Sequence, residues 1–165
     1  MSIGGFMNSS ILLSEDDVVN LREKYKREGK KLVFTNGCFD IIHVGHIKLL
    51  KKSKQIGDIL IVGLNSDDSV RRLKGKGRPI NKIKDRIEVL SAIRYVDHII
   101  VFDEDTPYNL INRLRPDVLV KGGDYKPDDV IGRDIVEGNG GEVVILPLVK
   151  GQSTTKILDR IQKYL

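Results

Sequence analysis

The sequence predicts an α/β domain built on a mainly parallel, five-stranded sheet. Short apolar runs typical of strands alternate along the chain with segments that repeat apolar residues at helical spacing. Segment 58–64 (DILIVGL) is an almost continuous apolar run, which is typical of a parallel strand buried on both faces. Because crossover connections are right-handed, the carboxyl ends of the strands should share the edge at which such sheets bind ligands.

Helix caps and turn residues mark where the individual elements begin and end. Ser14, followed by three acidic residues, is a typical helix start, and Gly29 ends that helix. The turn signal Asn36-Gly37 follows the first strand, and Asn81 is the expected cap of the fourth helix. The expected strands are 31–35, 58–64, 98–102, 117–121 and 142–146, and the expected helices are 14–29, 44–55, 66–74, 81–94, 106–114 and 153–164.

Composition narrows the class of protein. The chain has 165 residues, which suits one domain, expected over 13–165 after a flexible N-terminal tail over 1–12. The lone cysteine, Cys38, excludes an intramolecular disulfide and suits a cytoplasmic protein. We expect no membrane association, because no apolar run approaches the roughly 20 residues of a membrane span, and no signal peptide precedes the domain. The net charge of +5 is compatible with nucleic acid, with anionic metabolites or with solubility alone.

The first strand leads through a short loop into a helix that carries two histidines, His43 and His46, three residues apart. At that spacing the imidazoles share a face, and Gly45 between them permits a close approach to the backbone. A helix N-terminus attracts phosphate, so both rings can donate hydrogen bonds to a triphosphate. Two alternatives stay open, a metal site made of Cys38, Asp40 and both histidines, and a structural helix cap.

A strongly basic segment, residues 71–86, contains eight lysines and arginines and one acidic residue, Asp85. Gly75 and Gly77 predict a flexible loop in its middle. The segment is either a solvated surface or a mobile clamp that neutralises a transferring phosphate. Nucleic-acid binding is not expected, because the basic run lacks interleaved aromatic residues.

Two further stretches follow predicted strands and therefore belong at the ligand-binding edge. Segment 121–125 (KGGDY) contains two glycines, and segment 151–155 (GQSTT) opens the last helix with hydroxyl groups that either hold a phosphate or simply cap the helix. The chain contains no GxxxxGK[ST] loop, no GxGxxG after a strand and no GxSxG elbow. Walker-type NTPases, dinucleotide-binding domains and α/β-hydrolases are thereby excluded.

Residues 37–40 and 43–46 resemble the GxFD and HxGH motifs of the nucleotidyltransferase superfamily, and residues 153–155 are similar to its C-terminal STT motif. Segments 65–67, 73–75, 78–81, 104–107, 119–125 and 140–143 look like heptose-1-phosphate adenylyltransferases, so the resemblance covers about residues 14–163. It implies a Rossmann-like three-layer sandwich that transfers AMP from ATP to D-glycero-D-manno-heptose 1-phosphate. The products would be ADP-heptose, used for lipopolysaccharide or surface glycans, and pyrophosphate.

The resemblance also implies cofactors, partners and site residues. ATP would be a substrate, Mg²⁺ would assist, and a homodimer or higher homo-oligomer is expected. Many relatives are fused to a sugar kinase, and this chain is too short to contain one. The implied catalytic residues are His43, His46, Lys74 and Arg78. The implied nucleotide-binding residues are Thr35, Asn36, Gly37, Phe39, Asp40, Asn65, Asp67, Lys121, Gly122, Asp124, Ser153, Thr154 and Thr155.

The sequence departs from the family pattern just before the last motif. Gln152 precedes residues 153–155 where relatives often carry a small or apolar residue, and residues 149–151 (VKG) replace a stretch that contains arginine in related cytidylyltransferases. Both departures affect the nucleotide contacts near that helix. Another transferase of the superfamily, a cytidylyltransferase acting on glycerol 3-phosphate or a phospho-alcohol, is the first alternative. A nucleotide-binding regulatory module without turnover and a nucleic-acid binder are the alternatives from other classes.

Overall fold

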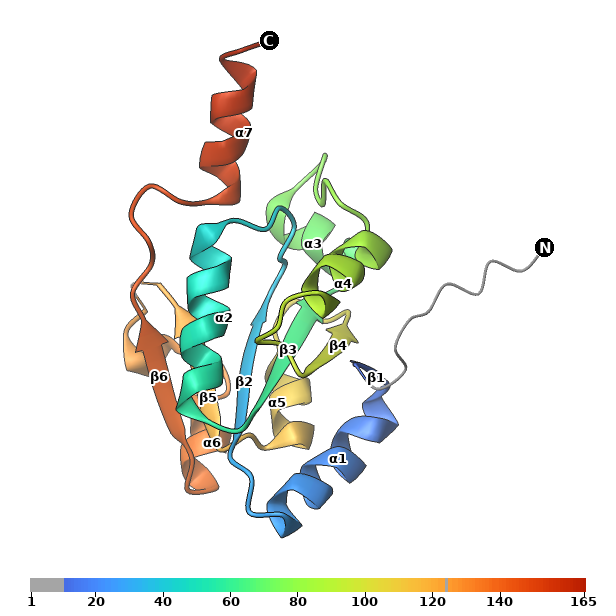
Figure 1. Cartoon of the computed structure of the whole chain (residues 1–165), viewed down its shortest axis with the longest axis vertical. Helices are drawn as coiled ribbons and strands as arrows, with labels where there is room; N and C mark the ends of the chain where they lie inside the picture. The colour runs from blue at the N-terminus through green and yellow to red at the C-terminus, as the bar shows by residue number, and fades with distance from the viewer. Residues whose placement is uncertain (1–10, 124) are drawn as a thin grey trace, which may run out of the picture.

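The computed structural model describes residues 11–123 and 125–165, which form a central sheet with helices packed on both of its faces (Figure 1). The strands are β1 (Leu12–Leu13), β2 (Leu32–Gly37), β3 (Ile59–Asn65), β4 (His98–Phe102), β5 (Val118–Gly122) and β6 (Glu142–Leu146). The helices are α1 (Glu15–Arg27), α2 (Val44–Ile56), α3 (Asp67–Lys74), α4 (Ile83–Ser91), α5 (Tyr108–Leu114), the 3₁₀ helix η1 (Pro127–Asp129), α6 (Arg133–Gly138) and α7 (Thr154–Gln162).

All strand pairs are parallel, and the strand order is β1-β4-β3-β2-β5-β6. The chain moves outward in one direction from β2 through β3 to β4 and then returns to place β5 on the other side of β2. The order of the strands therefore reverses between β2 and β5. In sheets of this kind ligands bind outside the carboxyl ends of the strands at that point.

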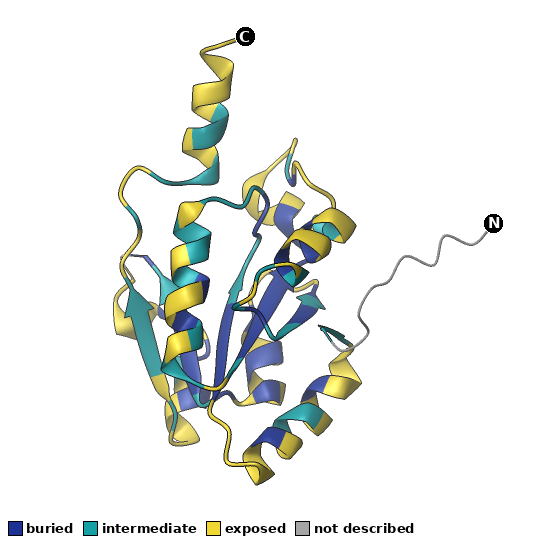
Figure 2. Cartoon of the chain, viewed as in Figure 1, coloured by how far each residue is buried: buried dark blue, intermediate teal, exposed yellow. Residues whose placement is uncertain are grey.

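Two apolar clusters, one on each face of the sheet, form the core (Figure 2). One joins α1, α5 and α6 to side chains such as Phe34 of β2 and Leu119 of β5. The other joins α2 and α4 to Val33 of β2 and Val120 of β5. Neighbouring residues of one strand thus pack on opposite faces, as the pleat of a strand requires.

The prediction of a mainly parallel α/β fold is confirmed, whereas the number of strands was wrong. The sheet has six strands, because Leu12 and Leu13 form β1 and pair with Ile99 and Ile100 of β4. A strand of two residues is too short to show a periodic pattern. Leu12 therefore belongs to the sheet and not to the expected tail 1–12, of which residues 1–10 lie outside the described residues.

Two helix predictions also need correction. Helix α6 was not expected, since six residues that end in glycine make too short a pattern to recognise. Helix α4 starts after Lys82 and ends at Ser91, not between Asn81 and Arg94. Asn81 does not cap it, because the side-chain amide of Asn81 donates to the carbonyl of Asp40 instead, at 2.7 Å.

Helix α7 extends away from the rest of the domain (Figure 1) and has no buried residue. It follows β6 through an irregular connection, so its first turn lies near the carboxyl edge of the sheet. Across residues 11–123 and 125–165, no helix combines the length and the apolar character that crossing a membrane would require.

Candidate active site

His43 and His46 cap the N-terminus of α2 with their own side chains. His43 is the N-cap residue, and its Nδ1 accepts a hydrogen bond from the backbone N–H of Gly45 at 3.1 Å. The Nδ1 of His46 accepts from the backbone N–H of His43 at 3.3 Å. The two rings lie 3.9 Å apart between centroids and are tilted by 33°. The interpretation of the two histidines as a helix cap is therefore confirmed, and the use of the same rings as donors to a triphosphate stays a prediction.

These hydrogen bonds decide which ring nitrogen carries the proton. A nitrogen that accepts a hydrogen bond is unprotonated, so the hydrogen of each neutral imidazole lies on Nε2. Burial, together with the neighbouring ring of His43, lowers the pKa of His46 to about 4, and burial also lowers the pKa of His43. Both rings are consequently neutral near pH 7, and each offers one Nε2–H donor at a helix N-terminus.

The metal-site interpretation gains no support from this geometry. Both Nδ1 atoms are occupied by backbone N–H groups. In the described part of the chain, no three side chains from among His, Cys, Asp and Glu gather in a way that would hold a metal ion. Burial raises the pKa of the Cys38 thiol, which also disfavours the thiolate that metals bind.

Glycines on either side of the loop make room for the aromatic rings. The buried Phe39 adopts a positive φ of 44°, and its ring lies 5.1 Å from that of His46. A Cβ atom added to Gly37 would lie 3.0 Å from the Phe39 ring. One added to Gly45 would lie 2.8 Å from Cε1 of His43. Bulky residues rarely adopt a positive φ, and such conformations gather at functional sites.

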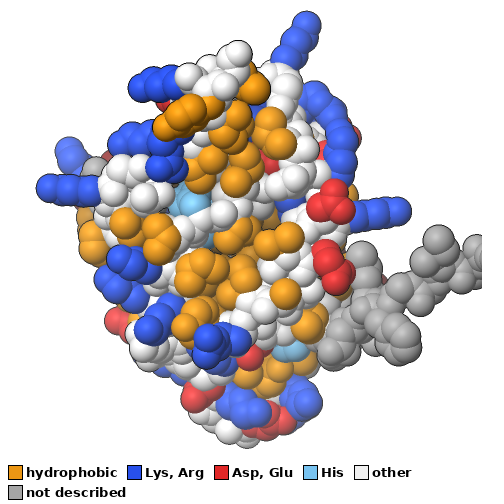
Figure 3. Space-filling model, turned by 45° about the horizontal axis from the view of Figure 1, so that its top comes forward, with side chains coloured by type: hydrophobic (Ala, Val, Ile, Leu, Met, Phe, Trp, Pro, Cys, Tyr) orange, Lys and Arg blue, Asp and Glu red, His pale blue; other side chains and the backbone are white. Residues whose placement is uncertain are grey.

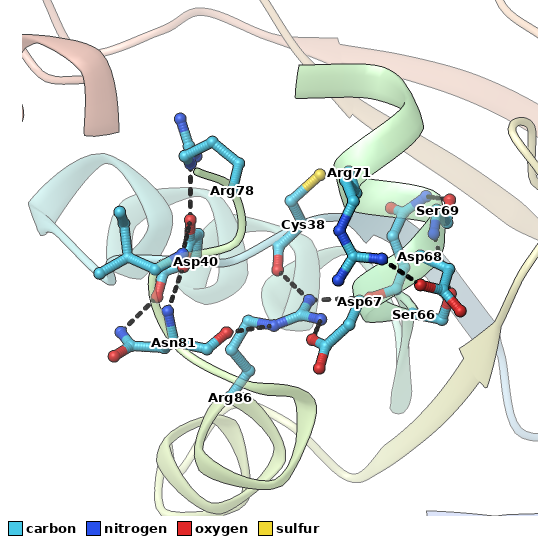
Figure 4. A network of polar contacts seen from close by, with 12 residues as sticks. Cys38, Asp40, Ser66, Asp67, Asp68, Ser69, Arg71, Arg78, Asn81 and Arg86 are labelled. Carbon is cyan, nitrogen blue, oxygen red and sulfur yellow. Dashed lines mark hydrogen bonds and ion pairs between the residues drawn. The ribbon is translucent and has the colours of Figure 1, made fainter. Parts of the chain in front are cut away.

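Asp40 is used by the chain itself to hold the loop before α4. Its carboxylate accepts hydrogen bonds from the backbone N–H groups of Ile80 and Asn81, at 2.9 and 2.8 Å, and from Nε of Arg78 at 2.7 Å. Burial raises the pKa of Asp40, but these hydrogen bonds outweigh that effect and keep the pKa below its usual value. Asp40 therefore positions Arg78 beside the histidine loop. The terminal nitrogen atoms of Arg78 point away from the carboxylate (Figure 4).

Arg86 is the largest fully buried side chain described and ties three segments of the site together (Figure 4). Its Nη1 donates to the carbonyls of Cys38 and Asn65 at 2.7 and 2.8 Å, and its Nε donates to the carbonyl of Asn81 at 3.1 Å. Its Nη2 forms an ion pair with Asp67 at 2.8 Å. Arg86 was expected to be one cation of the basic segment. It shares a helix face with Ile83 and Leu90, and that signal could have identified it as buried.

Four expected nucleotide-binding side chains also bond within the protein. The buried Thr35 hydroxyl donates to the carbonyl of Val120 at 3.0 Å, linking β2 to β5. The amide of Asn65 donates to the Ser69 hydroxyl at 3.0 Å. Lys121, at the end of β5, donates from Nζ to Oδ1 of Asn36 at 2.5 Å. These contacts arrange the carboxyl edge of the sheet around the point where the strand order reverses.

The start of α7 meets the start of α2. The Ser153 hydroxyl caps α7 by accepting from the backbone N–H of Lys156 at 3.1 Å, and the Thr154 hydroxyl donates to the carbonyl of Ile41 at 3.5 Å. The Cβ of Gln152 lies 3.7 Å from the position of a Cβ added to Gly45. The structure therefore brings residues 153–155 to the histidine pair, although more than 100 residues separate them in the sequence.

The remaining predicted residues lie around this centre. Gly122 packs against Leu49 of α2, Thr155 is exposed in the first turn of α7, and Lys74 is exposed at the end of α3. Asp124 lies outside the described residues. From the carboxyl-edge side, lysine and arginine side chains surround an area of apolar and histidine surface (Figure 3).

Known proteins are similar to this chain in sequence and in fold. The cytidylyltransferase-like family model matches residues 34–159. The bifunctional protein HldE of Syntrophotalea carbinolica is 52% identical over 156 residues, which are 90% of this chain and 32% of that protein. HldE of Geobacter sulfurreducens is 55% identical over 138 residues, which are 84% of this chain and 28% of that protein. The chain thus spans about a third of the length of these curated relatives.

Solved structures agree with the sequence comparisons. The lipopolysaccharide core biosynthesis protein of Thermoplasma volcanium is 33% identical, with a TM-score of 0.60, and the match covers 75% of this chain and all of that one. A pantoate-beta-alanine ligase from Francisella tularensis, 16% identical with a TM-score of 0.60, shares the fold. Since the family match includes both histidines and residues 153–155, the chain belongs to the cytidylyltransferase-like family of nucleotidyltransferases.

Proposed function

We propose that the protein is an adenylyltransferase that transfers AMP from ATP to D-glycero-D-manno-heptose 1-phosphate, releasing pyrophosphate and forming ADP-heptose. The motif resemblance and the half-identical HldE proteins support this substrate pair. The observation that carries the proposal is the pair of neutral imidazoles at the start of α2. Because each Nδ1 accepts a backbone hydrogen bond, each ring has its Nε2–H as the donor for a phosphate oxygen, at the point where such sheets bind ligands.

The reaction needs alignment and charge stabilisation more than proton transfer. A sugar phosphate is already a nucleophile near neutral pH, because its second pKa is about 6. One of its oxygens forms a bond to the α-phosphorus of ATP while the bond from that phosphorus to the bridging oxygen breaks, and the electron pair leaves with pyrophosphate. No general base and no covalent enzyme intermediate are required. His43 and His46 donate to the phosphate chain, where negative charge redistributes in the transition state.

The basic segment supplies the remaining positive charge. Arg78 is held beside the histidine loop by Asp40, and Lys74 is the last residue of α3, just before two glycines with positive φ, Gly75 and Gly77. Lys74 and Arg78 would approach the phosphates when ATP binds, as a clamp on the transferring group. Mg²⁺ would accompany the triphosphate, because hard cations prefer phosphate oxygens, and would neutralise the leaving pyrophosphate. A cytoplasmic location and a homodimer or higher homo-oligomer are also part of the proposal.

A product assay tests the proposed substrates. The protein is incubated with Mg²⁺ and ATP or CTP, each with both anomers of heptose 1-phosphate and with glycerol 3-phosphate, and the products are identified by mass spectrometry. We expect ADP-heptose and pyrophosphate from ATP with one anomer. CDP-glycerol as the main product would instead establish the cytidylyltransferase alternative, to which the family name points.

The role of His46 is tested separately, with the third histidine of the chain as a matched control. His46→Ala should keep the fold but lower kcat by about 10²- to 10³-fold, the usual effect of removing one preorganised donor. His98→Gln alters a residue that contacts Tyr25 away from α2, so its kcat should stay near that of the wild type. Normal turnover in His46→Ala would exclude His46 from the role proposed for it.

A further inference from the structure

We infer that the ammonium group of Lys121 binds the phosphate of the acceptor substrate, the sugar phosphate, and that the histidine pair binds the nucleotide. This inference rests on the proposed function and assigns the two phosphates to opposite sides of the carboxyl edge. It also changes the role that the family resemblance implies for Lys121, which is nucleotide binding.

Lys121 is a mostly buried cation whose polar partner, within the described residues, is the neutral amide of Asn36. Its Nζ donates to the amide oxygen of Asn36 at 2.5 Å. Burial lowers the pKa of Lys121 to about 8, and no carboxylate of the described residues contributes to this shift, so the group is still largely protonated near pH 7. A cation removed from water without a counter-charge is costly unless an anion is bound there. The substrates of the proposed reaction supply that anion.

The pleat of the sheet places Lys121 on the face opposite to the histidines. Leu119 of β5 and Phe34 of β2 pack against α1, α5 and α6. Lys121 and Asn36 each lie two residues further along these strands, so their side chains leave the sheet on that same face. The histidines belong to α2, which packs with Val33 and Val120 on the other face. The carboxyl ends of β2 and β5 therefore separate two groups of donors.

The stereochemistry of phosphoryl transfer assigns a substrate to each group. The attacking oxygen and the leaving oxygen lie roughly in line on opposite sides of the α-phosphorus. If the imidazoles of His43 and His46 hold the triphosphate on the α2 side, the attacking phosphate must approach from the other side. The Lys121 ammonium lies at that side, and Asn36 fixes its position. The new bond joins the acceptor oxygen to the α-phosphorus as the bond to pyrophosphate breaks, and Lys121 keeps its proton throughout.

Lys121→Met tests the inference because it removes the charge and keeps most of the volume. Replacing a buried charge by an apolar side chain of similar size is often neutral or stabilising, so the thermal unfolding midpoint should stay the same or rise. The KM for heptose 1-phosphate should increase about 10- to 100-fold, as expected for one charge-assisted hydrogen bond. The KM for ATP, and ATP affinity measured by calorimetry without acceptor, should change by less than about threefold.

Two further variants separate charge from packing. Lys121→Arg keeps the charge and should recover part of the acceptor affinity. Lys52→Met removes an exposed lysine of α2 and should leave both KM values unchanged. An unchanged acceptor KM in Lys121→Met, or a selective increase in the ATP KM, would overturn the inference while the wild-type enzyme still makes ADP-heptose. Failure of the proposed function would differ, since the wild type itself would then form no ADP-heptose.

Discussion

Replacing Arg86 by methionine should destabilise the whole active-site end of the domain. The side chain is buried, and it donates hydrogen bonds to three backbone carbonyls and to the carboxylate of Asp67. Methionine can fill most of the space but cannot donate to any of these oxygens. The change therefore removes the donor that joins the loop before α2, the end of β3 and the start of α4.

The expected cost follows from where these acceptors lie. Asn81 is exposed, so its carbonyl can turn to water, whereas Asn65 is buried and Cys38 is half-buried. Each buried acceptor that loses its donor costs about 1–3 kcal/mol, and breaking a buried ion pair costs about 3–5 kcal/mol. These contributions overlap, so we expect the free energy of unfolding to fall by about 3–5 kcal/mol. For a domain of this size the Tm should fall by about 6–20 °C.

Urea and thermal unfolding followed by circular dichroism measure this loss. Arg71→Met is the matched control, because Arg71 belongs to the same basic segment but, within residues 11–123 and 125–165, pairs only with the exposed Asp68. Its effect should stay within about 0.5 kcal/mol. If Arg86→Met unfolds within about 1 kcal/mol of the wild type, the buried network does not hold the loops together, and the reasoning is refuted.

Three more predictions concern the residues around the histidine pair. Gly45→Ala should lower the kcat of the proposed adenylyl transfer by at least about 10-fold without unfolding the protein, because the added Cβ would displace the His43 ring. Gly138→Ala is the control, since its Cβ meets no atom within 4 Å, and equal kcat values for the two variants would contradict this reasoning. The lowered pKa of His46 means that the unfolded chain binds more protons between about pH 4 and 6.5, so stability should rise with pH across that window. His46→Gln should flatten this part of the pH–stability curve, and an unchanged slope would show that His46 does not cause it. Asp40→Asn should lower the free energy of unfolding by about 1–3 kcal/mol and increase tryptic cleavage within residues 74–82, since it places an amide beside the backbone N–H groups that now donate to the Asp40 carboxylate. Cleavage at the wild-type rate would count against the role of Asp40 in anchoring this loop.

The histidine site could be located from the sequence because its signals are local. The strand, the glycine and the two histidines lie within twelve residues, and the helix N-terminus that unites them follows from the order of these residues. The alternation of strands and helices likewise predicted five of the six strands and the parallel sheet. Strand β1 and helix α6 were missed because each is too short for hydrophobic periodicity to be recognised.

The sequence by itself determined the class of fold, the likeness to nucleotidyltransferases and the position of the histidine loop that we propose binds phosphate. Only the tertiary structure decided that Arg86 is buried, that Asp40 holds Arg78, and that Lys121 leaves the sheet on the face opposite to α2, the helix that carries the histidines. Capping and periodicity act over a few residues, whereas the partners of Arg86 and Asp40 lie up to 48 and 41 positions away. Across such separations, the pairing of polar groups depends on how the helices and strands pack, and this packing is known only from the folded structure.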